Sequence, residues 1–320
     1  MKVLVTGANG FVGTALVQHL ARSGHDVVAH TRQPSADTVV SANRITRIHG
    51  AFEAVAQWSG ALQGCDAVVH TAARVHQVKD LAPDPLAAYR QANVQHTLAL
   101  AHAAAAHQVK RFIFVSSVKV HGEWSASGQP FKADDTLGAV DAYGISKQEA
   151  EASLHAMAAL SNMQVTTVRP TLVYGPGVKA NFLTMMRWLQ RGVPLPLGAI
   201  ANQRSLVGLD NLVDLLTLCL THSGAANQRF LASDGHDVST TELLLQLAAT
   251  LKVQPHLIPV PQAWLENALG LVGRQGLAQR LCGNLAVDID KTRQCLGWKP
   301  PLSLAEGLQA TAAHFLSQNK

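Results

Sequence analysis

The chain has 320 residues, of which 48% are hydrophobic and 15% are charged. This length and composition suit one large α/β unit, or two lobes that share a sheet, around a sizeable core. The formal net charge is +5, but no block of Lys or Arg runs along the chain. The composition therefore favours small anionic ligands and does not indicate nucleic-acid binding. No apolar run is long enough for a transmembrane helix, and we expect no signal peptide.

Cysteine and histidine spacing bears on metals and on the cellular compartment. The four cysteines show no C-x-x-C spacing, so we expect free thiols in a reducing cytoplasm. None of the fifteen histidines stands at a metal-ligand spacing from carboxylates or cysteines, so we predict no metal.

Short apolar runs alternate with stretches of helical periodicity along the first half of the chain. Strands are predicted at 3–6, 26–30, 45–48, 67–70, 111–115 and 165–168, and helices at 12–23, about 53–62, 86–108 and 143–160. Repeated strand–helix–strand units predict a parallel sheet covered on both faces. Right-handed crossovers then give a doubly wound α/β fold of Rossmann type.

The alternation breaks after residue 170. A helix is predicted near 181–191, a strand at 230–232, and a further helix from Ser239, which has capping-box spacing with Glu242. We therefore expect residues 1–170 to form the dinucleotide-binding domain. Residues 171–320 should mainly form a smaller substrate lobe, interleaved with the last strands of the main sheet.

Three glycines follow the first predicted strand in the spacing G-x-x-G-x-x-G, and a helical pattern opens directly after them. Gly7, Gly10 and Gly13 lack a Cβ, so backbone N–H groups can approach a pyrophosphate. The helix N-terminus adds positive potential at the same place. The strand, turn and helix together are the context that a dinucleotide fingerprint requires.

The residues after the second predicted strand bear on which nicotinamide cofactor binds. A carboxylate there would bind the ribose 2′-hydroxyl of NAD, but this chain has Thr31 and Arg32. An arginine can make charge-assisted bonds to the 2′-phosphate of NADP; an ordinary exposed arginine is the alternative. We therefore expect NADP(H) in preference to NAD(H).

A tyrosine and a lysine four residues apart form the candidate proton-transfer device. Tyr143 and Lys147 share a face of a predicted helix. A neighbouring ammonium and an oxidised nicotinamide ring would both stabilise the phenolate, so we expect a lowered pKa for Tyr143. Ser117, at the end of the fifth predicted strand, would hydrogen-bond the reacting oxygen. These motifs predict an oxidoreductase; a surface helix with a buried tyrosine is the alternative.

Together these motifs resemble the extended short-chain dehydrogenase/reductases, and within them the sugar-nucleotide epimerases, dehydratases and reductases. The resemblance covers nearly the whole chain, from the glycine turn through Tyr-Gly-Ile-Ser-Lys at 143–147 to Leu-Gly-Trp-Lys-Pro at 296–300. It implies a nicotinamide cofactor and a sugar-nucleotide substrate. The cofactor-binding positions are Gly7, Asn9, Gly10, Phe11, Val12, Gly13, Thr31, Arg32, Thr71, Ala72, Ala73, Asn93, Ser116, Tyr143, Lys147, Pro170 and Val173.

The same resemblance implies substrate-binding positions besides Ser117. Asn181 matches an asparagine that in UDP-sugar members contacts the diphosphate region, and Arg204 matches an arginine that commonly reaches it. Arg280 is a second such candidate. Forked guanidinium donors suit a diphosphate, while solvated surface charges are the alternative.

The resemblance implies action at C4 of a UDP-hexose or UDP-HexNAc, in sugar synthesis for surface polysaccharide or O-antigen. The enzyme would be a 4-keto reductase or a 4-epimerase. An epimerase recycles its own NAD, whereas a reductase most often consumes NADPH, so Arg32 favours reduction. A reductase of a non-nucleotide small molecule and a non-catalytic NADP-sensing protein are the alternatives. The substrate candidates argue against the first, and the complete Ser–Tyr–Lys set against the second.

Two surfaces carry expectations about partners. Residues 263–282 form an apolar helical pattern, which we expect to pack on the substrate lobe without stable membrane insertion; an interfacial anchor is the alternative. The resemblance also implies a homodimer formed through the helices at 86–108 and 143–160.

Overall fold

The computed structural model describes residues 1–33, 44–52, 55–75 and 82–318. Its main feature is a seven-stranded sheet in the order β3-β2-β1-β4-β5-β6-β9, with every neighbouring pair parallel. The strands are β1 (Lys2–Thr6), β2 (Asp26–Thr31), β3 (Ile45–His49), β4 (Ala67–His70), β5 (Arg111–Val115), β6 (Gln164–Pro170) and β9 (Arg229–Ala232). The predicted parallel, doubly wound sheet is confirmed. The strand order reverses beside β1, where such folds bind their ligands.

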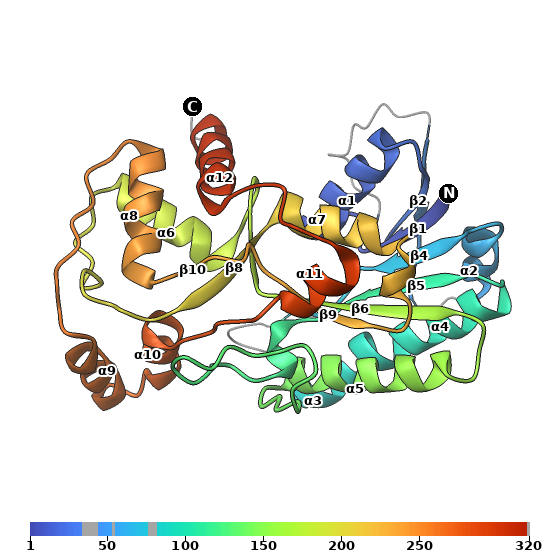
Figure 1. The fold of residues 1–320 in the computed structure, drawn as a ribbon, viewed down its shortest axis with the longest axis horizontal. Helices are drawn as coiled ribbons and strands as arrows, with labels where there is room; N and C mark the ends of the chain where they lie inside the picture. Colours follow the sequence, from blue (N-terminus) through green and yellow to red (C-terminus); the bar gives the residue numbers. More distant parts are fainter. Residues whose placement is uncertain (34–43, 53–54, 76–81, 319–320) are drawn as a thin grey trace.

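Helices cover both faces of this sheet (Figure 1). One face packs against α1 (Phe11–Arg22) and α7 (Leu209–Cys219) through the first core cluster. The opposite face packs against α2 (Val55–Leu62), α4 (His96–Ala106) and α5 (Ala142–Ala158) through the second cluster. Two cores separated by a sheet explain why the strands read as continuous apolar runs rather than as alternating patterns.

The predicted helix at 86–108 is more complex than its periodicity suggests. The structure has α3 (Pro85–Arg90), a π-helical turn η1 (Gln91–Gln95) and then α4. Asp84 caps the start of α3 by accepting the backbone N–H of Ala87 at 3.0 Å. Single π turns inside helices occur frequently at functional sites; this one contains Asn93.

The smaller lobe is built on a three-stranded sheet in the order β10-β8-β7 and lies to the left in Figure 1. Its strands are β7 (Leu172–Tyr174), β8 (Arg204–Gly208) and β10 (Asp237–Val238). Its helices are α6 (Ala180–Gln190), α8 (Thr240–Leu251), α9 (Gln262–Leu271), α10 (Gln275–Cys282) and α12 (Leu304–Gln318). The capping box of Ser239 and Glu242 at the start of α8 is confirmed.

The two lobes are interleaved in sequence, as expected. After β8 the chain returns to the main domain for α7, η3 (Ser223–Ala225) and β9, and it returns again for α11 (Asp290–Leu296). Residue 170, the predicted boundary, ends β6. The division into 1–170 and 171–320 stays a prediction.

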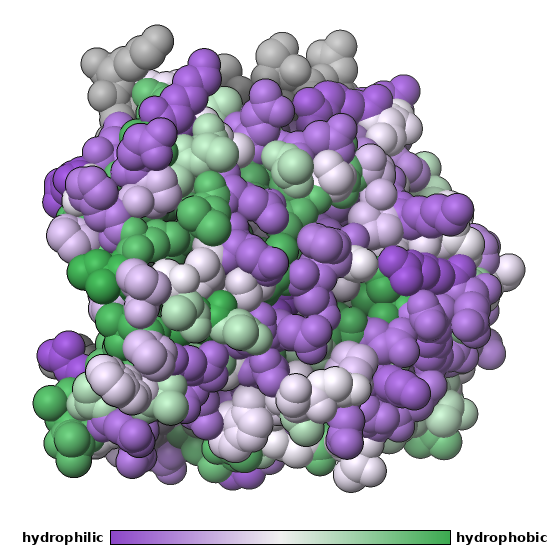
Figure 2. Space-filling view, turned by 60° about the vertical axis from the view of Figure 1, so that its left-hand side comes forward, coloured by the Kyte–Doolittle hydropathy of each residue, from purple (hydrophilic) through white to green (hydrophobic). Residues whose placement is uncertain are grey.

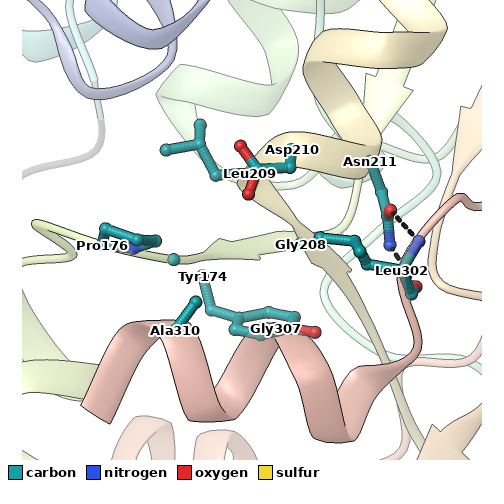
Figure 3. Close-up of a pocket in the computed structure, with 10 residues that line it drawn as sticks. Tyr174, Pro176, Gly208, Leu209, Asp210, Asn211, Leu302, Gly307 and Ala310 are labelled. Carbon is teal, nitrogen blue, oxygen red and sulfur yellow. Dashed lines mark hydrogen bonds between the residues drawn. The ribbon is translucent and has the colours of Figure 1, made fainter. Parts of the chain in front are cut away.

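Asp234, just after β9, joins the two sheets. Its carboxylate accepts the Tyr174 hydroxyl at 2.7 Å, the Gly208 N–H at 2.8 Å and the Asn211 amide at 2.7 Å. Asn211 also exchanges two hydrogen bonds with the backbone of Leu302, drawn dashed in Figure 3. The cavity drawn in Figure 3 has a volume of about 10 Å³, roughly the space of one water. It is therefore part of the contact region between the two sheets rather than a ligand site.

Candidate active site

The glycine turn between β1 and α1 forms a close-packed cradle. Gly7 has φ +69°, a left-handed conformation that glycine adopts without strain, and the Gly10 N–H donates to the Gly7 carbonyl at 2.8 Å. A Cβ on Gly13 would stand 2.1 Å from that carbonyl oxygen, and one on Gly7 would stand 2.8 Å from the nitrogen of Ala72. The turn is thus tight against the end of β4 while the first amides of α1 remain available to an anion.

The segment after β4 is fixed beside this cradle. The Thr71 hydroxyl donates to the Thr6 carbonyl at 2.7 Å, which places residues 71–73 at the carboxyl edge of the sheet. Asn93 holds the same segment, because its amide accepts the Arg74 N–H at 2.8 Å and donates to the Arg74 carbonyl at 3.0 Å. It also donates to Ser146 of α5 at 2.9 Å and is 1% exposed. These contacts favour a positioning role for Asn93.

Thr31 and Arg32, the two residues predicted to select the cofactor at the end of β2, differ in exposure. Thr31 is buried, and its hydroxyl donates to the Gln33 carbonyl at 2.9 Å and lies 2.7 Å from Nδ1 of His49. Arg32 is exposed. The side chain that can meet a 2′-substituent here is therefore Arg32, with the Thr31 hydroxyl already engaged.

Ser117 lies just beyond the carboxyl end of β5, and α5 carries Tyr143 and Lys147 four residues apart. The Ser117 and Tyr143 hydroxyls are hydrogen-bonded to each other. Lys147 is 1% exposed, and its Nζ lies 4.0 Å from the centroid of the Phe114 ring. Burial lowers the pKa of Lys147 to about 7, while the nearby Glu151 carboxylate raises it. Lys147 is therefore close to half-protonated near neutral pH.

The pKa of Tyr143 departs from the expected direction. Burial raises it to about 12; the Ser117 hydrogen bond lowers it, and Asp141 and Tyr89 raise it further. The expectation of a lowered pKa is wrong, because burial outweighs the lowering effect of the Ser117 hydrogen bond.

Ionic contacts fix the distance between the serine loop and the tyrosine helix. Asp141 caps α5 by accepting the Gly144 N–H at 2.6 Å, and it also forms an ion pair with Lys119. Lys119 lies in η2 (Val118–Val120), whose first turn is capped by the Ser117 hydroxyl, which accepts the Lys119 N–H at 3.2 Å. A Cβ on Gly144 would stand 2.8 Å from the Lys119 carbonyl oxygen. The caps of two helices therefore position Ser117 against Tyr143.

The sequence analysis did not predict a buried ion pair that joins α5 to β6. Glu151 and Arg169 are each 1% exposed and make three hydrogen bonds, the shortest at 2.6 Å. Arg169 also donates to the Ala133 carbonyl at 2.7 Å and lies 2.9 Å from Nε2 of His121. The signal that could have revealed the pair is the spacing of Tyr143, Lys147 and Glu151, which recur at every fourth residue of one helix.

The other predicted cofactor contacts line the same edge of the sheet. Ser116, directly after β5, is buried, and its hydroxyl has no hydrogen-bond partner in the part of the chain that the structure describes. Pro170 ends β6 and is buried, and Val173 in β7 is half-buried. The glycine cradle, this unpaired buried hydroxyl and the buried ammonium of Lys147 fit a nicotinamide dinucleotide.

The predicted substrate residues lie on the smaller lobe. Asn181 is exposed in the first turn of α6, and Arg280 is exposed on α10. Arg204 is partly buried at the start of β8, where it donates to the Gly283 carbonyl at 3.0 Å. This bond brings Arg204 beside the end of α10, the helix that carries Arg280, whereas Asn181 lies on α6.

Asn202 is a further residue of this lobe that the sequence analysis missed. Its buried amide donates to the Leu281 and Gly283 carbonyls at 3.2 and 3.0 Å and accepts the Thr240 N–H at 2.8 Å. Asn202 thereby ties the end of α10 to β8 and α8. Next to this joint lies an open cavity of about 450 Å³, lined by Trp124, Ser125, Glu266, Gln275, Ala278, Gln279, Gly283 and Asn284.

Comparisons with known proteins agree with this geometry. Residues 3–232 match the model of the NAD dependent epimerase/dehydratase family. The UDP-glucose 4-epimerase of Vibrio cholerae is 45% identical over 319 residues, which are 99% of this chain and 96% of that protein.

Solved structures with the same fold cover the whole chain. MoeE5 in complex with UDP-glucose and NAD has a TM-score of 0.77 at 25% identity, with 100% of both chains covered. The UDP-glucose 4-epimerase of Thermotoga maritima with UDP-glucose has a TM-score of 0.81 at 24% identity, with 100% of both chains covered. The chain belongs to the NAD dependent epimerase/dehydratase family. It is an NAD(P)-dependent sugar-nucleotide enzyme of the extended short-chain dehydrogenase/reductase type, as its motifs predicted.

Proposed function

We propose that the protein is an NAD-dependent 4-epimerase of a UDP-hexose, with UDP-glucose and UDP-galactose as the first pair to test. The observation that carries this proposal is the hydrogen bond between Ser117 and Tyr143, with the buried Lys147 four residues further along α5. The full-length similarity to a UDP-glucose 4-epimerase supports epimerisation over the reduction that we expected from Arg32.

The proposed mechanism assigns one task to each of three side chains. The bound nicotinamide supplies the chemistry of removing and returning a hydride at C4. Tyr143 takes the proton of the sugar 4-hydroxyl and later gives it back, and Ser117 hydrogen-bonds the same oxygen. Lys147, when protonated, stabilises the phenolate of Tyr143. Epimerisation then requires the 4-keto sugar to turn its other face to the ring.

The proposed substrate contacts use the smaller lobe. Arg204 and Arg280 would meet the diphosphate with forked donors, and Asn181 would contact it from the start of α6. The cavity beside α10 offers room for further parts of the ligand.

NAD is the cofactor that we propose, in place of NADP. The Thr31 hydroxyl is engaged within the protein, so Arg32 alone of this pair can meet a 2′-phosphate. MoeE5, which resembles this chain at full length, was solved with NAD. A cytoplasmic homodimer formed through α3 to α4 and α5, with a role in polysaccharide synthesis, completes the proposal.

The proposal is tested by identifying the bound cofactor and the sugar product. One portion of the purified protein would be denatured to release its nucleotide, which is identified by absorbance and mass. A second portion, left untreated, would be supplied with UDP-glucose or UDP-GlcNAc without added cofactor. We expect bound NAD and interconversion of the gluco and galacto sugars. Stoichiometric consumption of NADPH with a UDP-4-keto sugar, and no interconversion, would replace the epimerase with a C4 reductase.

A further inference from the structure

In the smaller lobe, α9 and α10 form a helical hairpin that the rest of the molecule barely covers. α9 has no buried residue, and among residues 261–280, all of which the structure describes, Ala278 alone is buried. Leu265 packs against the core of the lobe from the inner side of α9. The expected packing of this segment on the lobe is therefore limited to its inner edge.

The outer side of the hairpin is apolar. Trp264 is 71% exposed, Leu271 90% and Val272 66%. Trp264 and Leu271 are seven residues apart, so they share one face of α9, and Leu265 points about 100° away from Trp264. In the space-filling view that brings the smaller lobe forward, apolar patches stand among polar side chains on this side of the molecule (Figure 2). Clustered exposed apolar side chains mark interaction surfaces.

Basic residues gather in the same lobe. Residues 176–207 and 236–282 hold seven basic residues and three acidic ones, Asp237, Glu242 and Glu266. The whole chain has 26 basic and 21 acidic residues, so the remainder is close to neutral. The seven are Lys179, Arg187, Arg191, Arg204, Lys252, Arg274 and Arg280. The two segments lie together, because His256 Nδ1 lies 3.1 Å from the Gly192 carbonyl oxygen. Such asymmetry favours an anionic partner.

We infer that the α9–α10 hairpin docks the protein reversibly on an anionic lipid surface. Exposed Trp and Leu side chains with basic neighbours are the composition of helices that lie in a membrane interface. A nucleic acid would leave Leu271 and Val272 without a partner, and a second copy would bring like charges together. No helix in the described part of the chain is long and apolar enough to cross a membrane, so the binding is peripheral.

The experiment is co-sedimentation of the full chain with vesicles. One set contains phosphatidylcholine alone, and the other contains phosphatidylcholine and phosphatidylglycerol in equal parts. We expect binding to the second set, weakened by added salt because surface charges are screened. The double variant W264S/L271S should bind at least about tenfold more weakly, since it loses buried apolar area. R274E should also bind about tenfold more weakly, because each basic residue near the surface contributes attraction.

Two matched control variants change exposed residues of the main domain. L160S removes a leucine that is 91% exposed after α5, and R22E reverses an exposed charge on α1; both should bind like the wild type. Thermal midpoints and turnover in solution should be unchanged in W264S/L271S, because neither side chain is buried. Binding to neither vesicle, or equal binding by all variants, would overturn the inference. A dimer that W264S/L271S converts to a monomer, without vesicle binding, would reassign the surface to self-association.

Discussion

At the scale of single residues, Tyr143 separates a catalyst from a sensor. Replacing it with Phe removes the hydroxyl that hydrogen-bonds Ser117 but keeps the half-buried ring. We expect turnover to fall by about a hundredfold to ten-thousandfold, the usual effect of losing a general acid–base group. Cofactor binding, measured by the shift in thermal midpoint with NAD, should persist. Y89F is the control, because Tyr89 donates to the Val75 carbonyl and packs at 6.1 Å from the Tyr143 ring. Equal turnover in Y143F and wild type would return the protein to the sensor class.

The buried pair of Glu151 and Arg169 predicts an effect on stability. Replacing Glu151 with Gln removes the charge but keeps the shape, which leaves a buried guanidinium without its ion-pair partner. We expect a loss of about 3–5 kcal/mol in the free energy of unfolding, measured by denaturant titration.

The matched control for this variant is E149Q on the same helix. Glu149 pairs with Arg90 at 2.6 Å, but the two side chains are 35% and 47% exposed, so solvent screens the pair. The cost should be far smaller than that of E151Q, because exposed ion pairs contribute little to stability. If E151Q is as mild as E149Q, the buried pair contributes no more than a surface pair.

Residue-scale features differ in how far sequence predicts them. The glycine turn was predictable because its geometry is local and glycine spacing records it. Glu151 and Arg169 lie on α5 and β6, and Asn202 bonds residues about eighty positions away, so no local pattern reports either set. The predicted direction of the Tyr143 pKa shift was wrong for a related reason. The spacing places Lys147 on the same face of the helix, but it does not report how strongly burial affects either group.

At the scale of elements, the turn from β1 to α1 depends on Gly13. In G13A the Cβ would lie 2.1 Å from the Gly7 carbonyl oxygen, and backbone cannot yield as a flexible side chain can. We expect a stability loss of about 1–3 kcal/mol from overpacking. The stabilising effect of added NAD should also be lost, because the turn must shift.

The matched control for this prediction is G60A in α2. A Cβ on Gly60 meets nothing within 4 Å, so the helix should gain up to about 1 kcal/mol. Both variants are compared by thermal unfolding with and without NAD. Unchanged NAD stabilisation in G13A would contradict the assignment of this turn to the dinucleotide.

Sequence periodicity predicted most elements of the main domain and the helices α6 and α8 of the smaller lobe, but not the sheet of that lobe. Buried parallel strands and amphipathic helices leave regular patterns, so β1 to β6 and α1 were expected within a few residues. The sheet of β7, β8 and β10 was not, because its strands are short and pair across long stretches of chain. The π turn at Gln91–Gln95 was also missed, since an extra residue per turn barely changes an alanine-rich pattern.

At the scale of the whole molecule, buried histidines make stability depend on pH. Burial and the neighbouring Arg169 lower the pKa of His121 from 6.5 to about 4, and burial and Arg229 lower that of His155 to about 4. His70 is shifted in the same direction by burial and by Lys147. Each of these rings is kept neutral in the folded protein, whereas an unfolded chain would protonate it near its ordinary value.

The sign of the pH effect follows from proton binding. Below pH 6.5 the unfolded chain binds more protons than the folded one, so acid favours unfolding. The contribution of His121 is fully present above pH 6.5 and is lost as the pH falls toward 4; it amounts to at most about 3 kcal/mol. The free energy of unfolding should therefore decrease steeply over this window when it is measured by denaturant titration at successive pH values.

Substituting His121 isolates its share of that decrease. H121Q cannot take up a proton, so the loss of stability between pH 6.5 and 4 should be smaller than in the wild type, by at most about 3 kcal/mol. H107Q, at the exposed end of α4, is the matched control and should keep the wild-type slope. Parallel slopes for H121Q and wild type would mean that His121 is protonated, or relaxes toward solvent, in the folded protein. In that event Nδ1 of this buried ring, which has no hydrogen-bond partner among the described residues, would have to reach one after a change of conformation.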